Sequence, residues 1–259
     1  MKHFPFVYRL LVGLGLLPAT KSEHTPGLTA DCPPASGGYA KDVVFETITH
    51  KLKDIMLDMA KLTSSDYLID LGSGDGRIVI GAAKRGTRAL GIEFNTNLVT
   101  IARCAAIQEG VAESATFENA DIFKSDFSKA SVITMYLLPD LNLKLRPKIL
   151  DLKPGTRILS CSFGMADWQP DRTAGSAYFW IVPAKVDGIW KLENGQIRFD
   201  QQFQRITGVL SLEKDLKLIG KLEGNQISFT AGDQEYIGTV SDNIISGTHD
   251  QGSSWKATR

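Results

Sequence analysis

The chain has 259 residues, of which 43% are hydrophobic and 22% are charged, as in an ordinary globular protein. Its 29 basic and 29 acidic residues cancel, which argues against binding to nucleic acid as the main function, because phosphate backbones favour a clustered basic excess. The three cysteines have no CxxC or Cys/His ligand spacing, so no metal site is predicted.

The first segment, residues 1–40, is predicted to be an apolar leader followed by a linker. Lys2 and Arg9 flank the start of an apolar run, Leu10 to Leu17, which is shorter than the ~20 residues that a membrane-spanning helix needs. The run resembles the core of a signal peptide, but no clear cleavage site follows it. Export and a peripheral membrane anchor are both open. Residues 18–40 are rich in Pro, Gly and Ser, as linkers are.

The second segment, residues 41–186, alternates helical and strand patterns and predicts an α/β domain. Apolar residues three to four positions apart indicate a first helix over residues 47–61. Helical patterns between apolar strands imply crossovers, and therefore a mostly parallel sheet with helices on both faces. The predicted strands span residues 67–71, 89–94, 115–119, 132–138 and 156–163, and the further helices span 77–85, 97–109 and 141–152.

The third segment, residues 187–259, shows only short strand patterns separated by turn sequences such as NG and GN. Regularly spaced short strands without helices predict a small antiparallel all-β barrel or sandwich. No catalytic constellation is visible in this segment. The predicted strands are GIWKL, QIRFDQQF, ITGVLSL, LKLIGKL, QISFT, EYIGTV, NIISGT and SSWKAT.

A glycine-rich turn, in the sequence YLIDLGSGDGR over residues 67–77, joins a strand to a helix. Such a turn brings backbone N–H groups close to a ligand. A dinucleotide fingerprint would place a small residue where Arg77 stands, and the Gly-Lys-Ser/Thr of a phosphate loop is missing. Asp70 and Asp75 would also repel phosphates. An NAD-dependent oxidoreductase is therefore disfavoured, and a cationic ligand is favoured.

Two further acids follow the next strands. Glu93 ends the strand at residues 89–94, where a carboxylate can accept hydrogen bonds from both ribose hydroxyls. Dehydrogenases use the same arrangement, so Glu93 alone does not identify the ligand. Asp121 follows the strand at residues 115–119. Either acid could instead cap a helix or a loop.

The sequence DLGSGDG, from Asp70 to Gly76, resembles the first motif of the class I S-adenosylmethionine-dependent methyltransferases, which have a Rossmann-like sheet. The resemblance implies that the loop lies beside the methionine part of S-adenosylmethionine, with an acid facing its ammonium group. It also implies that Glu93 binds the ribose and that Asp121 binds the adenine amino group, with Ile122 beside the ring. The implied cofactor-binding residues are Asp70, Gly72, Ser73, Gly74, Gly76, Glu93, Asp121 and Ile122.

Residues 43–183 as a whole are similar to a branch of small protein-lysine methyltransferases known from mitochondria and archaea. The resemblance is carried by DLGSGDGRIVIGAAKRG, GVAESATFENADIF, VITMYLLPDLNLKLRPKILDLKPGTRILS and DWQPD. It implies a protein lysine amine as the methyl acceptor. Many amino-methyltransferases carry Asn/Asp-Pro-Pro-Tyr where this chain has Tyr136-Leu137-Leu138-Pro139. The missing polar amide leaves open a small molecule or lipid as acceptor, and an inactive fold that serves as a binding module.

Candidate active-site residues lie at the ends of the predicted elements. Tyr136 is the predicted catalytic residue, because a tyrosine can help a lysine amine to lose its proton. A tyrosine packed in the core is the alternative. Glu46 and Thr47 could line the cofactor mouth, although a helix cap at Thr47 is favoured. Trp168, close to Asp171, could wall a substrate channel, or pack under its loop.

The opening Gly188-Ile189-Trp190 resembles the G-x-W start of lipocalin-like barrels. The third segment could bind a lipid, dock a protein substrate or cover the sheet. S-adenosylmethionine is charged and made in the cytosol, which favours a cytoplasmic enzyme or one on the cytoplasmic face of a membrane. Export through the leader is the alternative. The sequence does not predict the oligomeric state.

Overall fold

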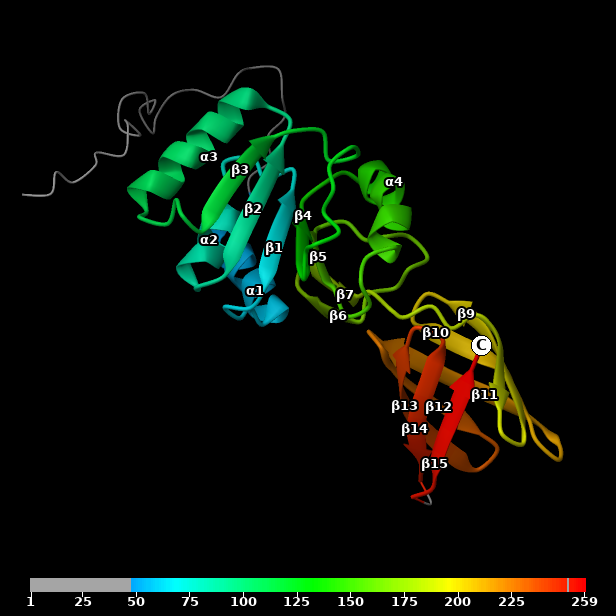
Figure 1. Ribbon diagram of the computed structural model, residues 1–259. Helices are drawn as coiled ribbons and strands as arrows, with labels where there is room; N and C mark the ends of the chain where they lie inside the picture. Colours follow the sequence, from blue (N-terminus) through cyan, green and yellow to red (C-terminus); the bar gives the residue numbers. More distant parts are fainter. Residues whose placement is uncertain (1–47, 251) are drawn as a thin grey trace, which may run out of the picture. The chain divides into compact units, whose positions relative to one another are not determined.

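The computed structural model describes residues 48–250 and 252–259 (Figure 1). Within this range, a seven-stranded sheet with helices precedes a closed eight-stranded barrel. The elements of the sheet domain are α1 (His50–Ala60), β1 (Tyr67–Leu71), α2 (Arg77–Lys84), β2 (Arg88–Glu93), α3 (Thr96–Gln108), β3 (Ala115–Asn119), β4 (Val132–Met135), α4 (Pro139–Leu150), β5 (Arg157–Cys161), β6 (Arg172–Ala174) and β7 (Ala177–Ile181).

The strands of the sheet lie in the order β3-β2-β1-β4-β5-β7-β6. The first five are parallel, and β7 runs antiparallel to both β5 and β6. The predicted mostly parallel sheet is therefore confirmed. The chain moves outward through β2 and β3 and then returns to the other side of β1 at β4. The carboxyl ends of β1 and β4 thus border a switch point, where open α/β sheets bind ligands.

Both faces of the sheet are buried, which explains why its strands are continuous apolar runs. Successive side chains of a strand point to opposite faces. Leu68 packs in a cluster with Met56 of α1 and Val79 of α2, whereas Ile69 packs in a second cluster with Leu145 of α4. The helices α1, α2 and α3 therefore cover one face and α4 covers the other (Figure 1).

Several boundaries differ from the sequence prediction. The first helix begins at His50, after the N-cap Thr49, whose Oγ1 accepts a hydrogen bond from the Leu52 N–H at 3.2 Å. The strands predicted to reach residues 138 and 163 end at Met135 and Cys161. The hairpin of β6 and β7 was not predicted.

The second domain is a barrel in which each strand pairs with the next one along the chain. All eight predicted strands are present, and the closed barrel rules out the sandwich alternative. β15 closes it by pairing with β8, with Thr258 opposite Lys191. Trp190, Phe199 and Phe229 fill its interior. Its strands are β8 (Gly188–Leu192), β9 (Gly195–Gln202), β10 (Arg205–Ser211), β11 (Asp215–Glu223), β12 (Gln226–Ala231), β13 (Gln234–Ser241), β14 (Ile244–His249) and β15 (Ser254–Thr258).

Among the described residues, no helix has both the length and the apolar character needed to cross a membrane.

Candidate active site

The glycine loop between β1 and α2 is attached to the end of the neighbouring strand β2. The N–H groups of Gly72 and Ser73 both donate to the carbonyl oxygen of Ile92, at 2.8 and 3.1 Å. Gly72 has a φ of +78°, and a Cβ there would lie 2.9 Å from Leu137 Cδ2. At Gly76, the N-cap of α2, φ is +80° and a Cβ would lie 2.6 Å from the Phe117 ring. Glycine is therefore required at both positions.

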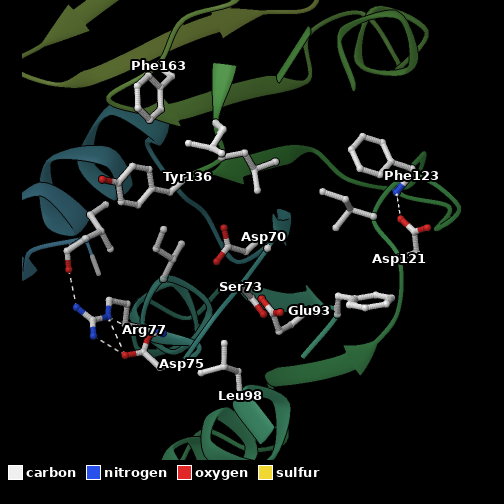
Figure 2. Close-up of a pocket in the computed structure, with 17 residues that line it drawn as sticks. Asp70, Ser73, Asp75, Arg77, Glu93, Leu98, Asp121, Phe123, Tyr136 and Phe163 are labelled. Carbon is white, nitrogen blue, oxygen red and sulfur yellow. Dashed lines mark hydrogen bonds and ion pairs between the residues drawn. The ribbon is translucent and has the colours of Figure 1, made fainter. Parts of the chain in front are cut away.

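A cavity of about 590 Å³ opens beside this loop (Figure 2). Most of the predicted site residues meet there, although they come from four different parts of the chain. Gly74 and Gly76 do not line the cavity and shape the loop instead. The predicted residues that line it are Asp70, Gly72, Ser73, Glu93, Asp121, Ile122 and Tyr136.

The cavity is strongly acidic. Four carboxylates line it, and the guanidinium of Arg77 is the cation among its lining residues. Arg77 Nε donates to Asp75 Oδ1 at 2.9 Å, and Arg77 Nη1 donates to the carbonyl of Ile48. This ion pair neutralises Asp75 and leaves Asp70, Glu93 and Asp121 to attract a cation.

Asp70 is the most deeply buried of these acids, with 3% of its surface exposed. Burial raises the pKa of its carboxyl to about 7, against the hydrogen bond from Thr134, and the charges of Glu93 and Asp75 raise it further. Thr134 lies opposite Asp70 on β4, and its Oγ1 donates to Asp70 Oδ1 at 2.7 Å. The carboxyl is therefore held in one orientation, at the end of the strand that enters the loop.

Glu93 is oriented by two backbone donors at the end of β2. The Gly74 N–H donates to Oε2 at 3.0 Å, and the Asn95 N–H donates to Oε1 at 2.8 Å. Each oxygen keeps a lone pair for a ligand, so the carboxylate can accept hydrogen bonds from two neighbouring hydroxyls. Although Gly74 does not line the cavity, its N–H thus positions a residue that does.

Asp121 and Ile122 border the cavity in the segment after β3. Asp121 Oδ1 accepts the N–H of Phe123 at 2.9 Å, and Lys124 Nζ lies 3.8 Å from Oδ2. The turn therefore fixes one oxygen and leaves the other near the surface. Figure 2 shows Phe123 close to Asp121, so an aromatic side chain accompanies the acid at this end of the cavity.

The residues that bind S-adenosylmethionine in this fold can be accommodated by this cavity. The carboxylates suit its sulfonium and ammonium charges. Ser73 Oγ is buried and lacks a hydrogen-bond partner among the described residues, as expected of a group that meets a polar ligand. The donor set therefore fits the cofactor that the glycine loop predicts.

Tyr136 follows β4 and lines the cavity, because the chain leaves the sheet one residue earlier, at Met135. Its ring stacks on Phe163, with 6.5 Å between ring centroids and 27° between the ring planes. In Figure 2 the two rings lie on the opposite side of Asp70 from Glu93. The cavity thus has a carboxylate-rich part and an aromatic part.

Trp168 does not wall a substrate channel, so that hypothesis is wrong. The side chain is fully buried and packs against Trp180 and Phe203 in the core under α4. The alternative, packing under its loop, is confirmed. Asp171 accepts the Ile181 N–H at 2.8 Å and secures β7. Glu46 and Thr47 lie outside the described residues.

Large apolar side chains at the mouth of the cavity were missed by sequence reasoning. Phe94 is 79% exposed and Leu138 is 64% exposed, which is unusual for residues of this size. Phe94 directly follows Glu93, and Leu138 precedes Pro139, the first residue of α4. Apolar residues just beyond strand ends were the available signal. The lining residues not predicted as cofactor-binding or catalytic are Ile48, Asp75, Arg77, Ile78, Phe94, Leu98, Phe123, Leu137, Leu138 and Phe163.

Comparisons with known proteins agree with this geometry. Residues 70–172 match the ANTKMT methyltransferase domain. A protein-lysine N-methyltransferase of Saccharolobus islandicus is 38% identical over 135 residues, which are 51% of this chain and 84% of that protein. A human lysine N-methyltransferase, named for a component of ATP synthase, is 37% identical over 132 residues, which are 51% of this chain and 53% of the human protein. The chain thus spans about half the length of that relative.

Among solved structures, an RNA methyltransferase from Salinibacter ruber in complex with S-adenosyl-L-homocysteine is 43% identical. The match covers 54% of this chain and 96% of that protein, with a TM-score of 0.53. The similarity includes the fold, the glycine loop and the acids that follow it. The chain therefore belongs to the family of the ANTKMT methyltransferase domain and is an S-adenosylmethionine-dependent methyltransferase.

Proposed function

We propose that this enzyme methylates the side-chain amine of a lysine in a protein. The observation that carries the proposal is the division of the cavity into a carboxylate-rich part, with Asp70 and Glu93, and an aromatic part, with Tyr136 and Phe163. An alkyl amine can enter between aromatic rings toward a cofactor held by the carboxylates. The names of the relatives from Saccharolobus islandicus and human support a lysine acceptor.

Little side-chain chemistry is required for this reaction. S-adenosylmethionine supplies an activated methyl group when it is bound, and the protein aligns the acceptor nitrogen with it. The amine must also be neutral, and a dry aromatic wall disfavours its charged form. Tyr136 is the residue that we propose to orient the amine and assist the loss of its proton. Asp70, Ser73 and Glu93 hold the cofactor.

The acceptor can be identified with labelled cofactor. The purified full-length chain is incubated with methyl-labelled S-adenosylmethionine and separate protein, RNA and lipid fractions of a cell extract. The expected result is label in protein, recovered as methyl-lysine after acid hydrolysis. RNA is the second candidate, because the relative from Salinibacter ruber is described as an RNA methyltransferase. Label in RNA, in lipid or in small molecules alone would contradict the lysine proposal.

We propose that the barrel docks the protein substrate and that its likeness to lipocalins is architectural. Buried side chains such as Trp190, Phe199 and Phe229 occupy its interior, which favours a role for its outer surface. Removal of residues 187–259 should then leave S-adenosylhomocysteine binding intact and abolish methylation of protein. Unchanged methylation would show that the barrel has no part in docking.

We also propose that the enzyme works at the cytoplasmic face of a membrane, held there by the leader within residues 1–40. The charge of S-adenosylmethionine supports this location, because a charged cofactor does not cross a bilayer unaided. Cell fractionation combined with N-terminal sequencing tests it. A mature protein that is exported without residues 1–17 would refute the proposal.

A further inference from the structure

The loop that follows β5 carries Phe163 to the cavity in an unusual backbone conformation. Ser162 has a φ of +61°, which is uncommon for a residue other than glycine. Its N–H donates to the carbonyl of Ser176 at 2.7 Å, on the turn before β7. Phe163 follows directly and stacks on Tyr136. A loop in this conformation needs interactions that hold it in place.

Asn142 supplies these interactions from the first half of α4. Its side chain is fully buried. The two hydrogens on Nδ2 are shared among Ser160 Oγ at 3.2 Å, the Phe163 carbonyl at 3.2 Å and the Gly164 carbonyl at 3.3 Å. Ser160 Oγ donates to the same Phe163 carbonyl at 2.7 Å. The backbone of Phe163 is thus bound by two buried side chains.

The orientation of the Asn142 amide follows from its surroundings. With the amide reversed, Oδ1 would face the two carbonyl oxygens of Phe163 and Gly164, which cannot donate. In the observed orientation Oδ1 has no hydrogen-bond partner among the described residues. A buried acceptor without a partner lowers stability, and an apolar side chain of the same size would avoid that cost. Asn142 is therefore poorly explained by packing alone.

Asn142 also connects both segments of the aromatic part of the cavity. Its backbone N–H donates to the carbonyl of Leu138 at 3.1 Å, in the segment that carries Tyr136. Its side chain holds the carbonyl of Phe163. One residue therefore sets the separation between the two rings.

We propose that Asn142, together with Ser160, is a positioning residue that holds Phe163 against Tyr136 and so fixes the width of the acceptor entrance. The inference rests on the proposed entry of the methyl acceptor between these rings. Neither residue lines the cavity, so both act through Phe163. Loss of the amide should let Phe163 move and misalign the acceptor, without loss of the cofactor-binding carboxylates.

The test compares Asn142→Leu and Ser160→Ala with Thr87→Val in the full-length chain. Thr87 is also fully buried, and its Oγ1 donates to the Thr63 carbonyl at 3.0 Å, away from the cavity. 4-Fluorophenylalanine at position 163 reports the ring environment by ¹⁹F NMR, without any acceptor. Asn142→Leu should shift and broaden this resonance, and Ser160→Ala should do so less. Thr87→Val should leave it unchanged.

Kinetics supply the second readout, with the protein fraction of a cell extract as acceptor. Methylation at low extract concentration should fall about 10- to 100-fold in Asn142→Leu, as for a small misplacement of reacting groups. The dissociation constant of S-adenosylhomocysteine should change less than about twofold. Thr87→Val should retain the wild-type rate.

An unchanged ¹⁹F resonance in Asn142→Leu would overturn the inference, and so would an equal loss of rate in Thr87→Val. If Asn142→Leu does not fold, the same readouts in Ser160→Ala decide, because that variant keeps Asn142 and removes only one donor to Phe163. The ring position is read without an acceptor. A failure of the lysine proposal would therefore leave the NMR result intact and remain distinguishable from a failure of this inference.

Discussion

Asp70 shows what a single residue gains from its position in the fold. Its place in the glycine loop predicts contact with a cation, but its protonation depends on burial among three strands, which the sequence does not reveal. With the pKa raised to about 7, the carboxyl is partly protonated near neutral pH in the protein without ligand. A ligand ammonium group beside it would favour the ionised form.

Cofactor affinity should therefore depend on pH through Asp70. The affinity for S-adenosylhomocysteine should rise between about pH 6 and pH 7.5, with release of a proton below pH 7. Calorimetry in two buffers of different ionisation enthalpy measures both quantities. In Asp70→Asn the affinity should be weaker and nearly independent of pH over this range. A flat profile in the wild-type protein would exclude a titrating carboxyl at the ligand.

The same raised pKa affects the stability of the protein without ligand. The folded state retains a proton on Asp70 that the unfolded chain releases above about pH 4. The free energy of unfolding should therefore fall as the pH rises from about 4 to about 7, by at most about 1.4 kcal/mol per pH unit from this group. Urea unfolding of Asp70→Asn should lack this contribution.

Glu93 depends on the two N–H groups that orient its oxygens. In Glu93→Gln the amide nitrogen would face one of these donors, so the side chain must turn away. We expect the dissociation constant of S-adenosylhomocysteine to rise about 10- to 100-fold, the equivalent of about 1.4–2.7 kcal/mol. Glu118→Gln, on the exposed side of β3, is the matched control and should bind as the wild type does. Equal affinities in both variants would remove Glu93 from the cofactor site.

At the scale of elements, the prediction errors concentrate where strands reach the cavity. The strands β4 and β5 were predicted too long, because Tyr136–Leu138 and Phe163 are apolar like the residues before them. These side chains line a cavity and do not pack in the sheet. Apolar composition does not separate the two environments. The barrel strands were predicted correctly because their alternation and turns are local signals.

The hairpin of β6 and β7 was missed for a related reason. The run AYFWI of β7 is apolar and short, and no helix precedes it, so the βα pattern of the preceding segments does not extend to it. Its partners are decided by long-range pairing with β5. Cavity residues such as Ser73 and Asp121 could be predicted from order along the chain, whereas Asn142 could not, because its role depends on contacts across the fold.

Asp66 joins three elements at the amino-terminal edge of the sheet. Its carboxylate accepts hydrogen bonds from the Thr63 N–H at 2.8 Å and Ser131 Oγ at 2.7 Å, and forms an ion pair with Arg157. Burial raises the pKa, but the hydrogen bonds from Ser131 and Thr63 and the charge of Arg157 outweigh it and lower the pKa. This acid therefore stabilises the fold above its unfolded pKa, and the effect is lost as the pH falls through the folded pKa.

Asp66→Asn should lower the free energy of unfolding by about 2 kcal/mol at pH 7, because a buried charge of Arg157 loses its partner. Chemical denaturation at pH 7 and near pH 3 measures the change. The difference from wild type should shrink at the lower pH, where the wild-type carboxyl takes up a proton. Asp58→Asn, on the exposed side of α1, is the control. A difference that is constant with pH would contradict the ionic role.

At the scale of the whole molecule, Trp168 links the sheet domain to the first hairpin of the barrel. Phe203, between β9 and β10, stacks on it with 5.8 Å between ring centroids and 17° between the planes. The next residue, Gln204, donates from Nε2 to the Gln169 carbonyl at 2.8 Å and to Asp171 Oδ1 at 3.1 Å. The burial of Trp168 therefore depends on residues from both domains.

Phe203→Ala should expose Trp168 to water and lower stability by about 3 kcal/mol or more, as for other buried aromatic truncations. Tryptophan fluorescence should shift to longer wavelength, and the shift should disappear when Trp168 is replaced by phenylalanine. Affinity for S-adenosylhomocysteine should remain unchanged, because neither ring lines the cavity. Leu212→Ala, at an exposed barrel turn, is the control. Unchanged emission in Phe203→Ala would show that this stacking is not maintained in solution.

Closure of the barrel by its first and last strands constrains when each domain can form during synthesis. The seven strands of the sheet are all present in the chain before β8 is translated. The barrel strands up to β14 can pair in succession, but β8 has no partner on its open side until the chain has passed Thr258. On the ribosome, the cofactor site can therefore assemble while the barrel is still an open sheet with two unpaired edges. Chaperone binding during synthesis should accordingly concentrate on the barrel strands.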